Sequence, residues 1–408
     1  MADDTSTPAD GAPPRRFRAC VVLGTRPEAI KLAPVIRELQ RHPDRFETLV
    51  LTTSQHRQML SQALDAFQIT PSHDLGLTHA NQTLAEFTAR AVIALTESFA
   101  SLRPDVVIVQ GDTSTVVSAV LAAFYQGIPV AHVEAGLRSG DMRRPFPEEA
   151  NRRIASVATD QHFCPTEASR QNLLHEGVSS QDIYVTGNTI VDALQSISRP
   201  ETFEEPGLDQ VPWLTRRILL ATVHRRENLG AELRDICAAL REIVRARPDT
   251  HIVIPVHLNP KVREVVFAEL GDHPDVSLLN PLSYPDLLEV MRRSVMVLTD
   301  SGGIQEEAPA LRKPVLILRT VTERPEVVLA GFGRLVGTEP QTVVAHALEL
   351  LDNPAAVHAM TAGANPFGDG HAAERIVEIL WQRLSTGRQF ATPESRPPIP
   401  LPVVEAAP

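Results

Sequence analysis

The strongest constraint on the fold is a regular alternation of short apolar runs with segments of helical periodicity. Residues 17–25, FRACVVLGT, form a β-branched run that ends in Gly, and residues 27–42 then show the spacing of a helix. Such runs are typical of parallel strands buried on both faces. We therefore predict an α/β fold of parallel sheets covered by helices. Further runs recur at residues 48–53, 105–112, 128–136, 160–166, 182–188, 216–224, 250–257, 276–281, 293–303, 312–320 and 333–337.

The chain length predicts two domains. With 408 residues, the chain exceeds the size at which one hydrophobic core keeps growing. Residues 198–212 are rich in Pro and Glu and lack periodicity, so we place a linker there. The expected units are an N-terminal domain at 17–197 and a C-terminal domain at 213–386, whose last helix could pack back on the first domain. Residues 1–16 and 387–408 are expected to be disordered tails.

Charge and cysteine content exclude several classes of protein. A net charge of -11 argues against a nucleic-acid-binding surface and against binding to an anionic membrane. Cys20, Cys164 and Cys237 are widely spaced and form no Cys-x-x-Cys motif, which favours a reducing compartment without a zinc site. We find neither a signal-peptide pattern nor an apolar run long enough to cross a bilayer. We therefore expect a cytoplasmic protein.

Polar residues after the predicted strands are the first candidates for a functional site. Ligands of parallel sheets bind beyond the carboxyl ends of the strands, so a two-domain chain should hold its site between the domains. GTRPEAIK, at residues 24–31, places Arg26 and Lys31 beside a helix N-terminus, which suits an anionic ligand. The segment matches neither the dinucleotide fingerprint nor a Walker A loop. An ordinary loop with solvated charges is the alternative.

A second candidate segment is DSGGIQEEA, at residues 300–308. Ser301, Gly302 and Gly303 lie between a predicted strand and a helix, and the two glycines let a phosphate approach the N–H groups of the helix start. Glu306 and Glu307 follow one turn later, where a carboxylate can accept hydrogen bonds from ribose hydroxyls. The alternative is that these acids only cap the helix.

Two other strand ends add cations. His224 and Arg225 follow a predicted strand in TVHRREN, and Arg324 follows another in TERPE. Arginine binds phosphate through two N–H groups and stays charged, so these residues could neutralise a diphosphate in place of a metal ion. A single His after a strand is equally compatible with a structural role.

Carboxylates end two successive strands. Asp112 ends one run and Glu134 ends the next, so the two should lie close together. Crowding in a cleft raises the pKa of one carboxyl and makes acid and base roles available near neutral pH. Asp112 could instead cap the following helix.

A predicted helix that begins with acidic residues and continues with basic ones follows these strands. Glu148 and Glu149 open the predicted helix, and Glu148–Arg152 and Glu149–Arg153 have i,i+4 spacing. Surface ion pairing is the simplest interpretation, but it does not explain the Gly- and Arg-rich loop that precedes the helix.

Ten segments together carry a family resemblance. In chain order they are GTRPEAIKLAPVI, TSQHRQML, QGDTST, HVEAGLRSGD, PFPEEANR, TGNTIVDAL, TVHRREN, PVHLNP, DSGGIQEEAP and TERPE. With them the chain resembles the non-hydrolysing UDP-N-acetylglucosamine 2-epimerases over residues 18–380. The resemblance implies a GT-B fold, in which two Rossmann-like domains face a cleft, and interconversion of UDP-GlcNAc and UDP-ManNAc without a cofactor or metal. It also implies a homodimer that supplies ManNAc units for cell-surface polysaccharide.

The resemblance implies roles for individual residues. Asp112, Glu134 and Glu148 match the catalytic carboxylates, and His224 is assigned to the catalytic residues with them. The activating site, where bacterial members bind a second UDP-GlcNAc, matches Gln55, Gln58 and His257. The substrate-binding positions match Arg26, Lys31, Arg152, Arg225, Leu282, Ser301, Gly302, Gly303, Glu307 and Arg324, of which Leu282 would contact uracil through its backbone.

The implied reaction is loss of UDP from C1 with proton removal from C2, followed by re-addition of UDP to the 2-acetamidoglucal. The chain departs from the family pattern at Thr320, Val321, Arg143 and Arg144, which flank the sugar-side loops. These departures leave open an epimerase of a modified sugar such as a UDP-2,3-diacetamido-uronate. Separate alternatives are a UDP-sugar glycosyltransferase of the same fold, a hydrolysing epimerase, and a non-catalytic sugar-nucleotide sensor.

Overall fold

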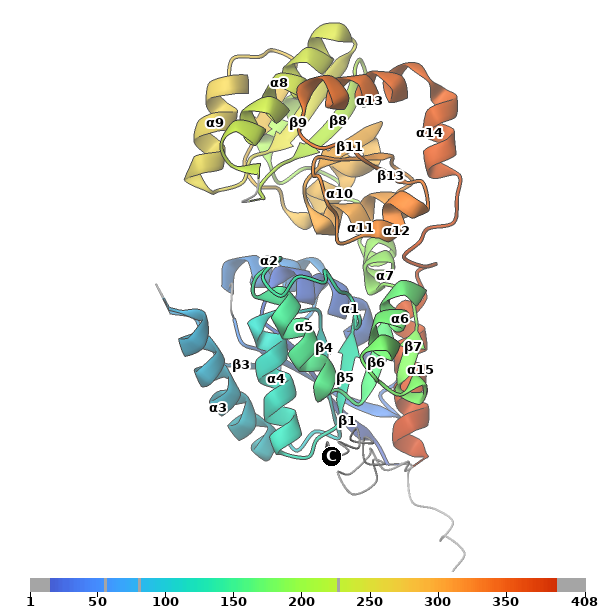
Figure 1. Ribbon diagram of the computed structural model, residues 1–408. Helices are drawn as coiled ribbons and strands as arrows, with labels where there is room; N and C mark the ends of the chain where they lie inside the picture. The colour runs from blue at the N-terminus through green and yellow to red at the C-terminus, as the bar shows by residue number, and fades with distance from the viewer. Residues whose placement is uncertain (1–14, 55–56, 80–81, 226–227, 387–408) are drawn as a thin grey trace, which may run out of the picture.

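Two parallel sheets form the framework of the protein. The computed structural model describes residues 15–54, 57–79, 82–225 and 228–386. In these ranges, one sheet has the strand order β3-β2-β1-β4-β5-β6-β7 and the other has the order β10-β9-β8-β11-β12-β13. Figure 1 shows them as separate domains, with the N-terminal domain below and the C-terminal domain above. This confirms the predicted α/β fold class. The expected tails, residues 1–16 and 387–408, lie outside the described residues except for 15 and 16.

The strands follow the apolar runs of the sequence. Each of the twelve predicted runs overlaps a strand, because a short extended apolar segment can be buried on both faces when its backbone pairs with neighbouring strands. One strand was missed, β3, because it has two exposed polar residues and is defined by backbone pairing with β2. The strands are β1 (Phe17–Leu23), β2 (Phe46–Thr52), β3 (His73–Asp74), β4 (Val106–Gln110), β5 (Val130–Val133), β6 (Gln161–Cys164), β7 (Ile183–Val185), β8 (Arg217–Thr222), β9 (Thr250–Pro255), β10 (Val276–Leu279), β11 (Met296–Thr299), β12 (Val315–Ile317) and β13 (Gly333–Leu335).

Helices connect the strands and cover both faces of each sheet. In the N-terminal domain they are α1 (Arg26–Arg41), α2 (Arg57–Ala66), α3 (Leu84–Leu102), α4 (Ser114–Tyr125), α5 (Glu148–Val157), α6 (Glu167–His175) and α7 (Thr189–Ser196). After residue 197 they are α8 (Ala231–Ala246), α9 (Pro260–Leu270), α10 (Tyr284–Arg293), α11 (Gly302–Ala310), α12 (Pro325–Leu329), α13 (Pro340–Asp352), α14 (Pro354–Thr361) and α15 (Ala372–Ser385). Short 3-10 turns lie before β7, at Ser180–Asp182, and before β8, at Pro206–Gln210. None of the helices in the described part of the chain is long and apolar enough to span a membrane.

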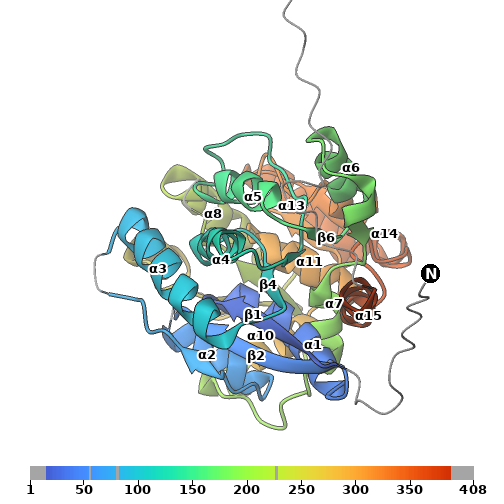
Figure 2. The same ribbon diagram turned by 90° about the horizontal axis from the view of Figure 1, so that it is seen from below.

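Alternating side chains of the first sheet pack into two separate hydrophobic cores, one on each face. Val21 and Leu23 of β1 pack in the core that contains α1, α7 and α15, whereas Cys20 and Val22 pack with α3 and α4 on the other face. Figure 2 shows α4 on one side of β1 and β4, and α1 on the other. The period of two along a strand is the reason for this division.

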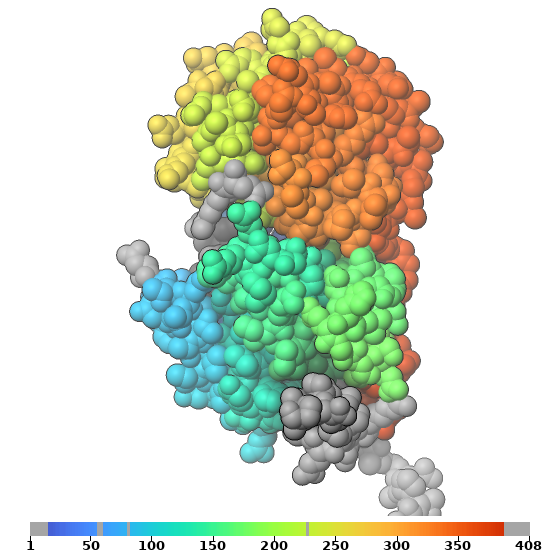
Figure 3. Space-filling view, in the orientation of Figure 1, coloured from blue at the N-terminus to red at the C-terminus, as the bar shows by residue number. Residues whose placement is uncertain are grey.

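One apolar core continues from the first domain into the second. The cluster on the α1 side also contains Leu220 of β8, Leu288 of α10 and Ile304 of α11. Helix α11 packs against α7, and α10 packs against α2. Figure 3 shows the two domains meeting along this boundary, with the orange part of the C-terminal domain resting on the green part of the N-terminal domain.

The last helix leaves the C-terminal domain and lies on the first one. Helix α15 packs against α1 and α7, and Figure 1 shows it in red beside the N-terminal sheet. Trp381 contacts Phe17 and Phe46 edge-on, at centroid distances of 5.7 and 6.0 Å. Asp192 of α7 accepts a hydrogen bond from the backbone N–H of Ala373, at 2.8 Å, and so caps the start of α15.

Candidate active site between the domains

The predicted site residues lie at the carboxyl ends of the central strands in both sheets. In the N-terminal sheet, β1, β4 and β5 are neighbours, and Arg26, Asp112 and Glu134 follow them. In the C-terminal sheet, β8 and β11 are neighbours, and His224 and Ser301 follow them. Since all these strands are parallel, each set gathers at one edge of its sheet.

Buried charges join the two edges. Lys31 of α1 forms ion pairs with Glu134 of its own domain and with Glu306 of α11, the latter at 2.7 Å between Nζ and Oε2. Glu306 also pairs with Arg324 through Oε1 and Nε. All four side chains are buried. Buried charges of this kind are tolerated only when each one has partners of opposite sign.

The pKa values of these groups follow from burial and from their neighbours. Burial raises the pKa of Glu134, and the nearby cation of Lys31 only partly opposes the shift. Burial by itself would lower the pKa of Lys31, but Glu134 and Glu306 together raise it. Glu306 has a lowered pKa because Arg324 and Lys31 outweigh its burial. These neighbours therefore favour the ionised form of Glu306, whereas burial favours the protonated form of Glu134, as expected for a group that transfers protons.

The backbone at Glu134 is in the left-handed region, with a φ of 63°. Non-glycine residues rarely adopt this conformation, and such strain is concentrated at functional sites. The turn directs the Glu134 carboxylate toward Lys31, and Gln110 at the end of β4 donates a hydrogen bond to it at 3.1 Å.

Asp112 is held by a different cation. Arg152 of α5 donates from Nε to Oδ2 of Asp112 at 2.9 Å, and its Nη2 lies 2.7 Å from the same oxygen. Asn151 donates to the backbone carbonyl of Asp112 at 2.8 Å, so one helix fixes both parts of the residue. Asp112 and Glu134 therefore lie at adjacent strand ends, each with its own arginine or lysine.

The expected ion pairs of α5 are partly wrong. Glu149 pairs with Arg153 at 3.4 Å as expected, but Arg152 pairs with Glu149 at 3.0 Å and with Asp112, and not with Glu148. The reason is that Glu149 points into the protein and is fully buried. Glu148 keeps a buried Oε2 with no hydrogen-bond partner among the described residues. A buried, unpaired carboxylate oxygen at a helix start is suited to contact a ligand.

His224 is fixed by a buried aspartate. Asp300, which follows β11, accepts hydrogen bonds from the backbone N–H groups of His224 and Arg225 and from the amide of Asn228, at 2.9 to 3.1 Å. Its Oδ1 also lies 3.3 Å from Nδ1 of His224. Burial lowers the pKa of His224 in spite of Asp300. Burial thus favours the neutral imidazole, whose ring stacks on that of His257 at a centroid distance of 5.6 Å.

The N-terminus of α11 is surrounded by arginines. Ser301 occupies the N-cap position without a side-chain hydrogen bond, so it leaves the first N–H groups of the helix available. A Cβ on Gly302 would lie 3.3 Å from Nη2 of Arg225, which shows how closely the backbone approaches this cation. Glu323 pairs with Arg225 at 3.0 Å, and although burial opposes it, the surrounding arginines lower the pKa of Glu323 to about 2.

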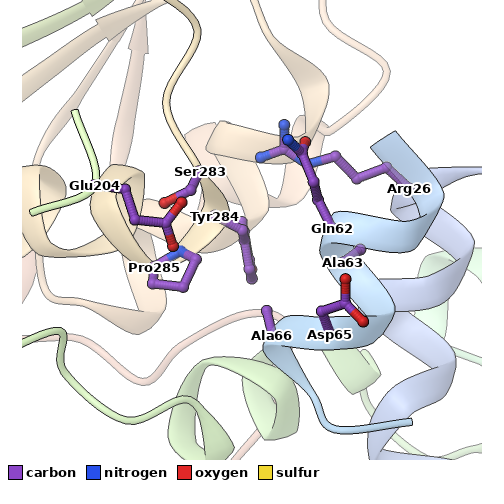
Figure 4. A pocket seen from close by; sticks show the side chains of 9 residues that line it. All are labelled: Arg26, Gln62, Ala63, Asp65, Ala66, Glu204, Ser283, Tyr284 and Pro285. Atoms are coloured by element: carbon purple, nitrogen blue, oxygen red, sulfur yellow. The ribbon is translucent and has the colours of Figure 1, made fainter. Parts of the chain in front are cut away.

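Glu307 contacts Tyr284, a residue that lines a neighbouring pocket. Tyr284 donates from its hydroxyl to Oε1 of Glu307 at 3.3 Å, and burial raises the pKa of Glu307 to about 7. The guanidinium of Arg26 lies 5.7 Å from the centre of the Tyr284 ring. Arg26 and Tyr284 also line a pocket of about 330 Å³ between α2 and the start of α10, next to Leu282 (Figure 4). Its other lining residues are Gln62, Ala63, Asp65, Ala66, Glu204, Ser283 and Pro285.

The proposed activating residues are only partly described. Gln55 lies outside the described residues, and for Gln58 the backbone of α2 is described but the side chain is not. His257 follows β9 and stacks on His224, so it lies beside the second-domain half of the site.

Sequence reasoning missed two residues that organise the site and the interdomain role of a third. Asp300 holds the loop of His224, and Glu323 pairs with Arg225. Glu306, which the sequence indicated only as a carboxylate near ribose, joins the domains. All three stand within segments that the sequence had singled out. Their spacing could have indicated that they are close to the site, but not which cation each one pairs with.

Comparison with known proteins confirms the family that the sequence motifs indicated. The family model for UDP-N-acetylglucosamine 2-epimerase matches residues 37–381. The UDP-N-acetylglucosamine 2-epimerase of Bacillus subtilis is 47% identical over 366 residues, which cover 90% of this chain and 95% of that protein. The UDP-GlcNAc 2-epimerase of Neisseria meningitidis, solved with UDP-GlcNAc, is 42% identical with a TM-score of 0.81, covering 90% and 100% of the two chains. MnaA of S. aureus, solved with UDP, is 43% identical with a TM-score of 0.83, covering 90% and 97%.

The family model matches most of both domains from residue 37 onward, and the Bacillus subtilis relative aligns with 90% of this chain. The chain therefore belongs to the UDP-N-acetylglucosamine 2-epimerase family.

Proposed function

We propose that the protein interconverts UDP-GlcNAc and UDP-ManNAc by inverting C2 of the sugar, without a metal ion or nicotinamide. The observation that carries this proposal is the pair of carboxylates at adjacent strand ends, Asp112 and Glu134, each held by its own buried cation. Family membership supports it, and so does the N. meningitidis relative, whose structure contains UDP-GlcNAc.

The proposed chemistry is an elimination followed by an addition. The C1–O bond to the diphosphate breaks and its electron pair leaves with UDP, while the C2 proton passes to a carboxylate, which gives a 2-acetamidoglucal. UDP then adds back to C1, and a proton is delivered to the opposite face of C2. Two faces require at least two proton-transfer groups, and Asp112, Glu134 and Glu148 are the candidates.

The C-terminal domain would hold the leaving group. His224, Arg225 and Arg324 and the start of α11 at Ser301, Gly302 and Gly303 offer N–H donors and positive charge to the diphosphate, whose negative charge grows as the C1–O bond breaks. Acid-base catalysis contributes about 10²- to 10⁴-fold, which is too little for an unactivated carbon. Electrostatic stabilisation of UDP must therefore supply much of the remaining rate.

Glu307 and the neighbouring pocket fit the nucleoside. The Glu307 carboxylate can accept hydrogen bonds from ribose hydroxyls, and the backbone of Leu282 lies at the start of α10, beside the pocket that Arg26 lines. We further propose that His257, together with Gln55 and Gln58, takes part in binding a second UDP-GlcNAc as an activator.

Assembly and cellular role complete the proposal. We infer a homodimer that acts in the cytoplasm and supplies ManNAc for cell-surface polysaccharide. Three buried free thiols, Cys20, Cys164 and Cys237, fit a reducing compartment. Helices α4 and α5, which are in contact, expose Phe124, Tyr125, Ile154 and Val157, and this apolar face suits a second copy of the chain.

One experiment separates this function from its alternatives. The protein is incubated with UDP-GlcNAc in D₂O, and the C2 and anomeric protons are followed by NMR. We expect UDP-ManNAc with deuterium at C2, also in the presence of excess EDTA. Free ManNAc with UDP would indicate a hydrolysing enzyme, and absence of C2 exchange would contradict the proposal. In that case a UDP-2,3-diacetamido-uronate is the next substrate, since Arg143, Arg144 and Val321, where the chain departs from the family pattern, are exposed.

The three carboxylates are tested individually. Asp112→Asn, Glu134→Gln and Glu148→Gln should each lower turnover at least about a hundredfold while UDP binding stays measurable. Near-normal turnover of any one variant would remove that residue from the mechanism.

A further inference from the structure

Glu306 has surroundings that nucleotide binding does not explain. It lies in the second turn of α11, its side chain is 1% exposed, and both carboxylate oxygens face cations. One cation, Lys31, belongs to the N-terminal domain, and the other, Arg324, belongs to the C-terminal domain. By contrast, its neighbour Glu307 faces Tyr284. Adjacent carboxylates on one helix therefore have different partners.

The ammonium group of Lys31 is shared by two carboxylates from different domains. Its Nζ pairs with Glu134, which follows β5, and with Oε2 of Glu306. The interdomain half of this arrangement exists only while α11 is docked on the N-terminal domain. While Glu306 pairs with Lys31, the ammonium group stabilises the ionised form of Glu134 less than it would alone.

We propose that Glu306 is a positioning residue for Glu134. Because the Glu306 carboxylate pairs with Lys31 and Arg324, the proton affinity of Glu134 depends on the docking of the C-terminal domain. This inference rests on the proposed function, in which Glu134 transfers a proton at C2. Docking of the domain that holds UDP then prepares the carboxylate of the other domain, so that proton transfer and departure of UDP occur in the same arrangement.

The direction of the effect follows from the groups around Glu134. They are Lys31 from α1, Arg324 before α12, Glu306 from α11 and the uncharged Gln110 from β4. Burial is the largest influence and raises the pKa of Glu134, Glu306 raises it further, and the two cations lower it. Removing the charge of Glu306 leaves both cations free to stabilise the ionised form of Glu134, so its pKa should fall.

The test compares Glu306→Gln with a matched control, Glu326→Gln. Glu326 also makes an interdomain contact, because it accepts a hydrogen bond from Thr166 at 2.9 Å, but it contacts neither Lys31 nor Glu134. The pH dependence of kcat/KM for UDP-GlcNAc is measured for both variants and the wild type. We expect the limb controlled by Glu134 to move about one pH unit or more toward acid in Glu306→Gln. Glu326→Gln should keep the wild-type limb.

Several outcomes would overturn the inference. A Glu306→Gln profile with unmoved limbs would do so, and so would an equal shift in both variants, which would indicate loss of domain docking alone. Glu306→Asp keeps the charge and should restore the wild-type limb even if kcat is lower.

A measurement on the unliganded protein covers the case in which Glu306→Gln is inactive. The urea midpoints of Glu306→Gln, Glu134→Gln and the double variant are compared at pH 8. Effects that are not additive support coupling through Lys31, and additive effects contradict it. If the wild type forms no UDP-ManNAc, the proposed function fails by itself, whereas this double-variant test still reports on the coupling.

Discussion

Arg152 places two of its nitrogen atoms on a single carboxylate oxygen of Asp112, with Nε at 2.9 Å and Nη2 at 2.7 Å. The contact spans 40 residues of sequence and orients a carboxylate that would otherwise rotate about its side-chain bonds. A guanidinium can hold an anion in this way because its N–H groups form a rigid fork.

Replacing Arg152 by Lys should therefore lower kcat for epimerisation about tenfold or more, since a lysine keeps the charge but not the fork. The measurement is steady-state kinetics with UDP-GlcNAc. Arg153→Lys is the control, because Arg153 pairs with the same Glu149 at 3.4 Å but not with Asp112. Equal losses in the two variants would show that the orientation of Asp112 is unimportant.

Gly136 should tolerate no side chain. Its φ of 87° disfavours any L residue, and a Cβ would lie 2.2 Å from the backbone carbonyl oxygen of Ser169. Gly140 has a φ of 78° but open space around it. Gly136→Ala should lower the free energy of unfolding by at least about 2 kcal/mol more than Gly140→Ala, in urea titrations. Equal effects would mean that α6, which carries Ser169, can move away.

Glu307 should make stability depend on pH. Its pKa is raised from 4.5 to about 7 in the folded protein because the carboxyl is buried. Between these values the folded state binds more protons than the unfolded state, so this group lowers stability as the pH rises. Relative to Glu307→Gln, the wild type should lose about 3 kcal/mol between pH 4.5 and pH 8. Parallel stability curves for the two proteins, from urea unfolding across this range, would show that Glu307 ionises normally.

The exposed apolar face of α4 and α5 should form the dimer interface. Val157 is 77% exposed on α5, and introducing a charge there should disfavour burial against a second copy. Val157→Glu should give a monomer in sedimentation or light-scattering measurements, while the wild type gives a dimer. Leu214→Glu, at an apolar residue that is 99% exposed in the segment before β8, should leave the dimer intact. A dimeric Val157→Glu would exclude this face.

Local sequence patterns predicted the strands, with one exception, and indicated candidate residues at their carboxyl ends. The run at β1 and the helical spacing after it, for example, predicted β1 and α1, because burial on both faces requires continuous apolar residues. The exception is β3, whose two polar residues carry no such pattern.

The sequence by itself determined which residue types stand at the strand ends, and the family motifs determined which of them to consider together. Only the tertiary structure decided their partners. Lys31 and Glu134 are 103 residues apart, and spacing along a helix suggested Glu148 as the partner of Arg152, whereas the fold brought it to Asp112. The physical reason is that an ion pair forms where two side chains are buried together, and that depends on how the sheets and domains pack. Periodicity specifies which face of an element is buried, but not which charged group of another element it meets.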